Sequence, residues 1–407
     1  MEISKISRTE WAERKVEELL SVPLISEFVF RSPKHNDPNE KEVIDHLIVH
    51  SGQSILISQK AQEDPGKRNI EHNELWVKKN IKNALKQIRG VIRNPNNRPK
   101  WCKHPRRGRV EFDPLPQIIH GIVLVETWHQ VDLSSLANEL PMEYMGIPLT
   151  YLSMNDFLNL IIHLRTVPEL LEYLAARRSL SETTLRIVGD EYTLFMLYLM
   201  NGGNFEGCTC HDDAGQKLAG NKNAVNEALD CNIKYRFYSN LLEHLANELY
   251  TRDPEYRQGL PPHLLSQFDP DEERKNYIIL QEILVDMRLR ERAELGRAFH
   301  AVIEGVSMQG EGFSFQASHI DGKDMVFLFI AVRKVCKEEI LRRAIMLTNA
   351  ARAYFKKKRC MAIVDRDGEH YDLILSPPDY KTTTEDEDAG RKYFGSLRMF
   401  DIDMSKL

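Results

Sequence analysis

The chain has 407 residues, of which 42% are hydrophobic and 28% charged, and its formal net charge is -5. This length allows two or three domains, and the composition excludes disordered, collagen-like and disulfide-rich proteins. The longest strongly apolar runs, such as Leu194 to Met200, are far shorter than the roughly 20 residues that span a bilayer. Six irregularly spaced cysteines indicate reduced thiols, and the N-terminus lacks the apolar core of a signal peptide. We therefore expect a soluble, cytoplasmic protein without a membrane partner.

The first predicted helix covers residues 8–21. Ser7 and Glu10 have the spacing of a capping box, and apolar residues then recur at helical intervals. Glu13 flanks the apolar stripe, so its side chain should face a neighbouring cleft. Residues 27–31, EFVFR, are rich in strand formers and predict a short strand after this helix.

A β-hairpin is predicted next. Residues 43–50 form its first strand, with Asp45, Leu47 and Val49 on one face, residues 51–53 form the turn, and residues 55–60 form the returning strand. Asp45 lies on the first strand, and Lys60 ends the second. The two side chains can converge if the register of the strands permits.

A basic segment follows the hairpin. Apolar residues at helical spacing predict a helix over residues 73–92, and the Pro- and Asn-rich residues 94–105 predict a loop. From Lys78 to Arg109 there are twelve Lys or Arg residues and no Asp or Glu. The expected nucleic-acid contacts are Lys78, Lys79, Lys82, Lys86, Arg89, Arg93, Arg106, Arg107 and Arg109.

Helices and strands continue to alternate. Residues 121–128 predict a buried strand, and residues 147–152 predict another before a helix capped by Ser153 or Asn155. This alternation favours an α/β fold with a mixed sheet flanked by helices.

The remainder is expected to contain a mostly helical middle region and a small α+β C-terminal domain. The predicted boundaries are residues 1–178, 179–290 and 291–407. In the last domain we expect strands at 312–316, 325–332 and 360–365 and a helix at 337–356, and we interpret residues 381–390 as a linker.

Glu13 in a first helix, Asp45 in VID and Lys60 in ILISQKAQ resemble the motif of the PD-(D/E)XK, or restriction-endonuclease-like, superfamily and its Mrr-like branch. The resemblance covers residues 7–178. It implies a metal-dependent endonuclease in which Asp45 and Glu13 bind the metal and Lys60 assists the attacking water. Ser58, Gln59 and Gln62 would line the site.

These residue types suit phosphodiester cleavage. A divalent cation, Mg²⁺ or Mn²⁺, neutralises developing charge and lowers the pKa of an attacking water, and it prefers oxygen ligands. The chain departs from the superfamily pattern at Ser58, where the family has a second carboxylate. Three interpretations stay open. Glu13, Glu42 or Glu63 replaces that carboxylate, Gln59 and main-chain carbonyls suffice, or the site is inactive and only clamps nucleic acid.

The basic segment points to nucleic acid without reference to any family. Twelve uncompensated positive charges repel one another unless an anion such as phosphate is present. Trp101, among Arg98, Lys100 and Lys103, could stack on a base or pack within the protein. We expect DNA as the partner, without excluding RNA.

Other sequence motifs give weaker evidence about function. Cys208, Cys210 and His211 depart from the usual spacing of zinc ligands, and the chain lacks a P-loop and a dinucleotide-binding glycine motif. By resemblance, an endonuclease with added domains suggests an effector of antiviral defence that forms a homo-oligomer or works with a companion defence protein. The alternative is a catalytically inactive nucleic-acid-binding or partner-binding subunit of a defence complex.

Overall fold

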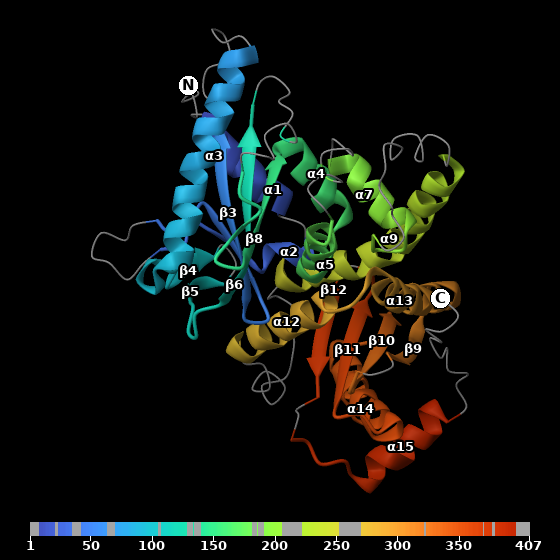
Figure 1. The fold of residues 1–407 in the computed structure, drawn as a ribbon. Coiled ribbons are helices and arrows are strands. Elements are labelled where there is room, and N and C mark those ends of the chain that lie inside the picture. Colours follow the sequence, from blue (N-terminus) through green and yellow to red (C-terminus); the bar gives the residue numbers. More distant parts are fainter. Residues whose placement is uncertain are drawn as a thin grey trace, which may run out of the picture. The chain divides into compact units, whose positions relative to one another are not determined.

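A computed structural model describes residues 8–20, 23–34, 42–62, 70–104, 107–127, 133, 140–180, 185, 191–205, 222–251, 270–320, 323–368, 370–376 and 379–395 (Figure 1). The chain divides into two compact units, Met1–Leu229 and Asp230–Leu407. Both combine helices with a mixed sheet, which confirms the expected α/β class. The division at residues 178 and 290 stays a prediction. Among the described helices, none is both long enough and apolar enough to cross a membrane.

The first unit is built on a six-stranded sheet with the order β1-β2-β3-β6-β8-β7. β1, β2 and β3 are antiparallel neighbours, β6 runs parallel to β3, β8 runs parallel to β6, and β7 is antiparallel to β8. The strands are β1 (Val29–Arg31), β2 (His46–His50), β3 (Gln53–Ala61), β6 (Gln117–Glu126), β7 (Glu143–Tyr144) and β8 (Ile147–Ser153). The parallel pair β3 and β6 is connected through helix α3 (Ile70–Arg93).

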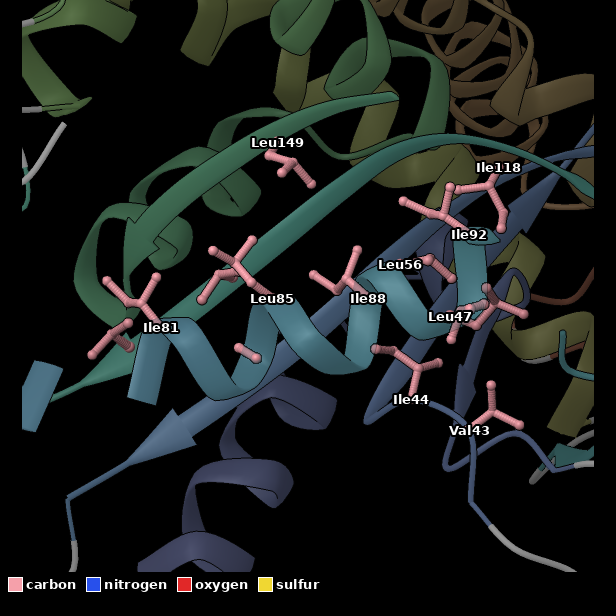
Figure 2. Packing of buried hydrophobic residues seen from close by; sticks show 14 of the residues in the cluster. Val43, Ile44, Leu47, Leu56, Ile81, Leu85, Ile88, Ile92, Ile118 and Leu149 are labelled. Atoms are coloured by element: carbon pink, nitrogen blue, oxygen red, sulfur yellow. The ribbon is translucent and has the colours of Figure 1, made fainter. Parts of the chain in front are cut away.

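Helix α3 packs its apolar stripe on one face of this sheet. Its residues Ile81, Leu85 and Ile88 point toward the strands that carry Leu56 and Leu149 (Figure 2). The spacing of these residues is the helical period seen in the sequence, so the helix predicted over residues 73–92 is confirmed and is slightly longer.

Helices α1 (Arg8–Leu20) and α4 (Met154–His163) also pack on the sheet, with α1 against β3 and α4 against β6 and β8. The first helix therefore forms where it was predicted, and it buries Ala12, Val16 and Leu20. The Ser153 side chain caps α4 in a capping box with Asp156, as the sequence suggested. Further helices of this unit are α2 (Pro23–Ser26), α5 (Val167–Arg178) and α7 (Glu191–Met200).

The loop expected over residues 94–105 is partly wrong. The segment contains a short 3-10 turn, Pro95–Asn97, and then β4 (Trp101–His104), which pairs with β5 (Gly108–Glu111). The main chain of Lys34 also bonds to this hairpin, because its N–H donates to Trp101 O at 2.9 Å and its carbonyl accepts from Lys100 N–H at 2.8 Å. Strand pairing outside the segment thus overrides the turn signal of proline and asparagine.

The second unit contains a four-stranded sheet with the order β12-β11-β10-β9, in which only β10 and β11 are parallel. Its elements are the main part of α9 (Lys222–Thr251), α12 (Pro270–Val285), α13 (Leu289–Gln309), β9 (Gly312–His319), β10 (Met325–Arg333), α14 (Lys337–Phe355), β11 (Arg359–Arg366), β12 (His370–Leu375) and α15 (Thr384–Phe394). The three predicted strands and the helix at 337–356 are present.

The linker expected over residues 381–390 is wrong, because α15 begins within it. Thr383 caps the helix, and Asp386 completes the capping box by accepting from the Thr383 N–H at 2.8 Å. Glu385 and Glu387 lie in the first turn, where negative charge is favourable. The acidic run is thus a helix start, and the helix buries Phe394 in the core around α14.

Gly296→Ala should destabilise the second unit. A Cβ at Gly296 of α13 would lie 2.0 Å from the main-chain oxygen of Tyr238 in α9, so the two helices would have to move apart. We expect the free energy of unfolding to fall by about 3 kcal/mol in chemical denaturation. Gly90→Ala is the control, since nothing lies within 4 Å of its added Cβ and helix propensity should raise stability by about 0.5–1 kcal/mol. Equal effects of the two substitutions would contradict this close helix contact.

Candidate active site

Asp45 and Lys60 lie side by side at the end of strand β3. The register pairs His46 of β2 with Ile57 of β3, which places Asp45 opposite Ser58. Lys60 Nζ is 3.5 Å from Asp45 Oδ2, and the two side chains are 24% and 12% exposed. The sequence-based expectation that these side chains converge agrees with this geometry.

The strand expected over residues 43–50 begins later, at His46. Residues 43–45 bond to the chain around Pro33 instead of extending the ladder. Val43 N–H donates to Pro33 O, and Asp45 O accepts from Ser32 N–H, each at 2.9 Å. Asp45 therefore stands just before β2, where its side chain reaches the end of β3.

Several donors hold the Asp45 carboxylate. Its Oδ2 accepts from the Gln59 main-chain N–H at 2.5 Å and lies 3.1 Å from Ser58 Oγ, while its Oδ1 lies 3.4 Å from Gln87 Nε2. With Lys60 these contacts fix the carboxylate in one orientation, which suits a group that must bind a ligand without reorganisation.

Two more carboxylates belong to this electrostatic network, because Glu42 interacts with both Asp45 and Glu13. The pKa of Glu42 is raised above 4.5, first by partial burial and then by the charge of Asp45, with Glu13 adding to it and Ser32 and Lys60 opposing it. Glu13 is paired with Arg31 at 3.0 Å. Asp45 is thus paired with Lys60 and Glu13 with Arg31, while Glu42 interacts electrostatically with Asp45, Glu13 and Lys60.

Asp45 and Glu42 offer oxygen atoms of the kind that a hard divalent cation takes as ligands. Carboxylate oxygens are the ligands that Mg²⁺ and Mn²⁺ prefer. Within the described ranges, however, no three or more His, Cys, Asp or Glu side chains are grouped closely enough to hold a metal. Because Glu13 is bound to Arg31, Glu42 is the better candidate for a second carboxylate beside Asp45. Glu63 lies outside the described residues.

The two predicted glutamines do not place their side chains at Asp45. Gln59 contributes its main-chain N–H, but its side chain is buried, and in the described structure neither amide atom has a hydrogen-bond partner. Gln62 is also buried, and its Nε2 donates to Asn73 Oδ1 of α3 at 2.8 Å. The alternation along β3 accounts for Gln59, whose side chain points away from the face that carries Ser58.

Sequence reasoning missed Gln87 on α3. Its Oε1 lies 2.9 Å from Ser58 Oγ, and its Nε2 lies 3.4 Å from Asp45 Oδ1 and 3.5 Å from Val43 O. The sequence signal for Gln87 is its position directly before the buried Ile88, in the apolar stripe of α3 that faces the sheet. A polar residue at that edge of a core-facing helix should meet a polar partner.

Helix α3 presents much of the expected basic surface. Lys79, Lys82, Lys86 and Arg93 are exposed, whereas Lys78 and Arg89 are half-buried. The Arg89 guanidinium lies 5.0 Å from the centre of the Tyr144 ring. These four exposed side chains lie on one helix and form a positively charged surface of the first unit.

The hairpin β4–β5 is less available than the sequence suggested. Arg107 donates to Glu27 O at 3.3 Å, and Arg109 pairs with Glu111 at 2.6 Å. The Arg109 guanidinium also lies 4.1 Å from the centre of the Trp101 ring, with Lys34 Nζ at 5.6 Å. Trp101 therefore packs against cationic side chains of the protein. Arg106 and the cysteines and histidine of the possible zinc motif at 208–211 lie outside the described residues.

His46 should make the first unit sensitive to acid. It is fully buried, and burial lowers its pKa to about 4, with Asp45 opposing and Arg31 adding to this shift. A lowered folded-state pKa contributes stability above the unfolded value of 6.5 that is lost as pH falls toward 4. We expect this loss to reach about 3 kcal/mol.

The measurement is the free energy of unfolding of wild type and His46→Gln at several values between pH 7 and pH 4. The variant should show a shallower decline, since other groups such as His120, whose pKa burial lowers to about 3, titrate equally in both proteins. Parallel curves for the two proteins would mean that His46 is not buried in its neutral form.

Comparison of the chain with protein-family models, with curated proteins and with solved structures gives no match. The interpretation of the site consequently rests on its geometry and chemistry.

Proposed function

We propose that the protein is a metal-dependent phosphodiesterase that cleaves nucleic acid, with its centre at Asp45 and Lys60. The observation that carries this proposal is the 3.5 Å contact between Lys60 Nζ and Asp45 Oδ2 at the end of β3, with Glu42 and Glu13 in electrostatic reach. Carboxylates that bind a cation next to an ammonium group can together promote phosphodiester hydrolysis.

The order of the elements supports the same proposal. The chain runs through α1, the short helix α2, the antiparallel strands β1, β2 and β3, helix α3 and the β4–β5 hairpin before β6, which is parallel to β3. A mixed sheet flanked by helices is what resemblance to the PD-(D/E)XK superfamily implies. Because folds host many activities, this agreement adds to the site and does not replace it.

In this mechanism Asp45 and Glu42 would hold the cation. The bound cation supplies charge neutralisation at the phosphate and a more acidic water. Lys60 donates hydrogen bonds to the water or to the phosphate oxygens, and its positive charge stabilises the additional negative charge of the transition state. The Gln59 main-chain N–H and Gln87 keep Asp45 in place.

The proposed substrate is DNA, with RNA as a possible second substrate. Lys79, Lys82, Lys86 and Arg93 are exposed on α3, the same helix that carries Gln87 at the site. Neutralising phosphates with release of counterions would favour binding of a nucleic acid over a small phosphodiester. By resemblance alone, we include in the proposal a cytoplasmic role in defence against foreign DNA, with self-association or a companion protein.

Binding without cleavage is the second candidate function. Each Asp45 oxygen already has a protein donor, and Ser58 stands where the superfamily pattern has a carboxylate. In this case Lys60 and the α3 lysines would clamp the phosphate backbone, and the defence complex would obtain catalysis from another subunit.

The test is incubation of the purified protein with duplex DNA, single-stranded DNA and RNA, each with Mg²⁺, Mn²⁺ or EDTA. We expect cleavage of at least one substrate with a divalent cation and none with EDTA. Tight binding of nucleic acid without cleavage under every condition would favour the second candidate.

A further inference from the structure

Ser58 is a buried hydroxyl that two acceptor oxygens approach. Its Oγ lies 2.9 Å from Gln87 Oε1 and 3.1 Å from Asp45 Oδ2. A hydroxyl has one proton to donate, so it can satisfy only one of the two oxygens at a time. The two oxygens belong to a carboxylate and an amide, and both kinds of oxygen serve as ligands of divalent cations.

Gln87 faces this point for a structural reason. It lies on α3 next to the buried Ile88, and the packing of α3 on the sheet holds its Cα over β3. Its two amide ends then meet different partners, with Oε1 toward Ser58 and Nε2 toward Asp45 and the Val43 carbonyl. The amide is therefore oriented by hydrogen bonds at both ends.

We propose that Gln87 is a cation-binding residue of the site and supplies, from α3, the neutral oxygen that stands in for the carboxylate absent at Ser58. This inference rests on the proposed function. A neutral oxygen donor in place of a carboxylate leaves the site one negative charge weaker, so divalent cations bind less tightly than they would to a site with the additional carboxylate. Gln87→Glu restores that charge without moving the main chain.

Metal binding provides a measurement that does not depend on cleavage. We expect calorimetric titration with Mn²⁺ to give about tenfold tighter binding for Gln87→Glu than for wild type, because the charge of the ligand set tunes cation affinity. Gln87→Leu should bind Mn²⁺ about 10- to 100-fold more weakly, because it loses both the oxygen and the donor that orients Asp45.

Asn83→Asp is the matched control. Asn83 is exposed one turn earlier on α3, so the substitution adds the same charge to the same helix without facing Ser58. We expect its Mn²⁺ affinity to change by less than about threefold, since an exposed charge is screened by solvent and salt. Equal gains for Asn83→Asp and Gln87→Glu would overturn the role of Gln87.

The melting temperature provides a second readout for a variant that folds poorly. Without metal, Gln87→Glu places two carboxylates together and should lower the melting temperature, and Mn²⁺ should then raise it by more than it raises that of wild type. A variant that Mn²⁺ stabilises no more than wild type would also contradict the proposal. Asp45→Asn distinguishes a failure of the proposed function from a failure of the Gln87 inference. If it binds Mn²⁺ as wild type does, the proposed function fails. If only the Gln87 variants behave like Asn83→Asp, the Gln87 inference fails alone.

Discussion

Lys60→Met should lower single-turnover cleavage about 100- to 1000-fold, because the transition state loses a positive charge held beside the metal site. The substitution also removes the ammonium group that lies 3.5 Å from Asp45. Mn²⁺ should therefore bind the variant at least as tightly as wild type. A loss of cleavage with retained metal affinity would assign Lys60 to the chemical step.

Asp45→Asn is the companion variant, and it should lose both metal binding and cleavage. Ser54→Ala serves as a folding control, since it removes a buried hydroxyl from the other end of β3 without removing a charge. Cleavage by Lys60→Met within about threefold of the wild-type rate would show that Lys60 is a structural partner of Asp45 and takes no part in hydrolysis.

Replacing Lys79, Lys82 and Lys86 together by Gln should weaken duplex DNA binding on the order of 100-fold at 0.1 M salt. The three side chains are exposed on α3, and each phosphate contact contributes about 0.9 to the slope of log affinity against log salt. The slope should therefore become shallower by about 2.7. Filter binding or fluorescence anisotropy across a salt series measures both quantities.

The control for this variant is the triple substitution of Lys334, Lys381 and Lys392 by Gln. These lysines are exposed in the second unit, and their replacement removes the same charge. We expect at most a small uniform loss of affinity from the lower net charge. Matching slopes for the two triple variants would remove α3 as the nucleic-acid surface.

The hairpin and α3 could be predicted because each carries its own periodic pattern. Residues 55–60 contain strand formers whose side chains alternate between the two faces of a strand, and apolar residues recur at helical spacing from Val77 to Val91, so both signals are local. The shared phase of Ser58 and Lys60 followed from the same alternation. That is why the Asp45–Lys60 contact could be anticipated.

Other features depend on partners that are distant in sequence. β4, which pairs with β5, also bonds to Lys34 through residues 100–101, and Gln87 meets Ser58 across 29 positions. The direction of the Gln59 side chain followed from the alternation, but its burial did not. Thr383 and Asp386 have the spacing of a capping box, but we interpreted the acidic run at 385–388 as part of a linker.

Glu13 illustrates how charge partners change the role assigned to a residue. Its place at the edge of the α1 stripe was predicted, but its ion pair with Arg31 was not, because Arg31 is 18 residues away on β1. The pKa of Glu42, in contrast, is raised first by burial and then by the charge of Asp45. The choice between Glu13 and Glu42 thus depends on tertiary electrostatics.

The position of a bound Mn²⁺ ion tests the central claim, a divalent cation at Asp45 beside Lys60, most directly. Crystals of the full chain grown with Mn²⁺ should show an anomalous scattering peak about 2.0–2.3 Å from an Asp45 carboxylate oxygen. The same peak should be absent from crystals of Asp45→Asn. A wild-type crystal saturated with Mn²⁺ that has no peak at Asp45, or has its peak elsewhere, would contradict the claim.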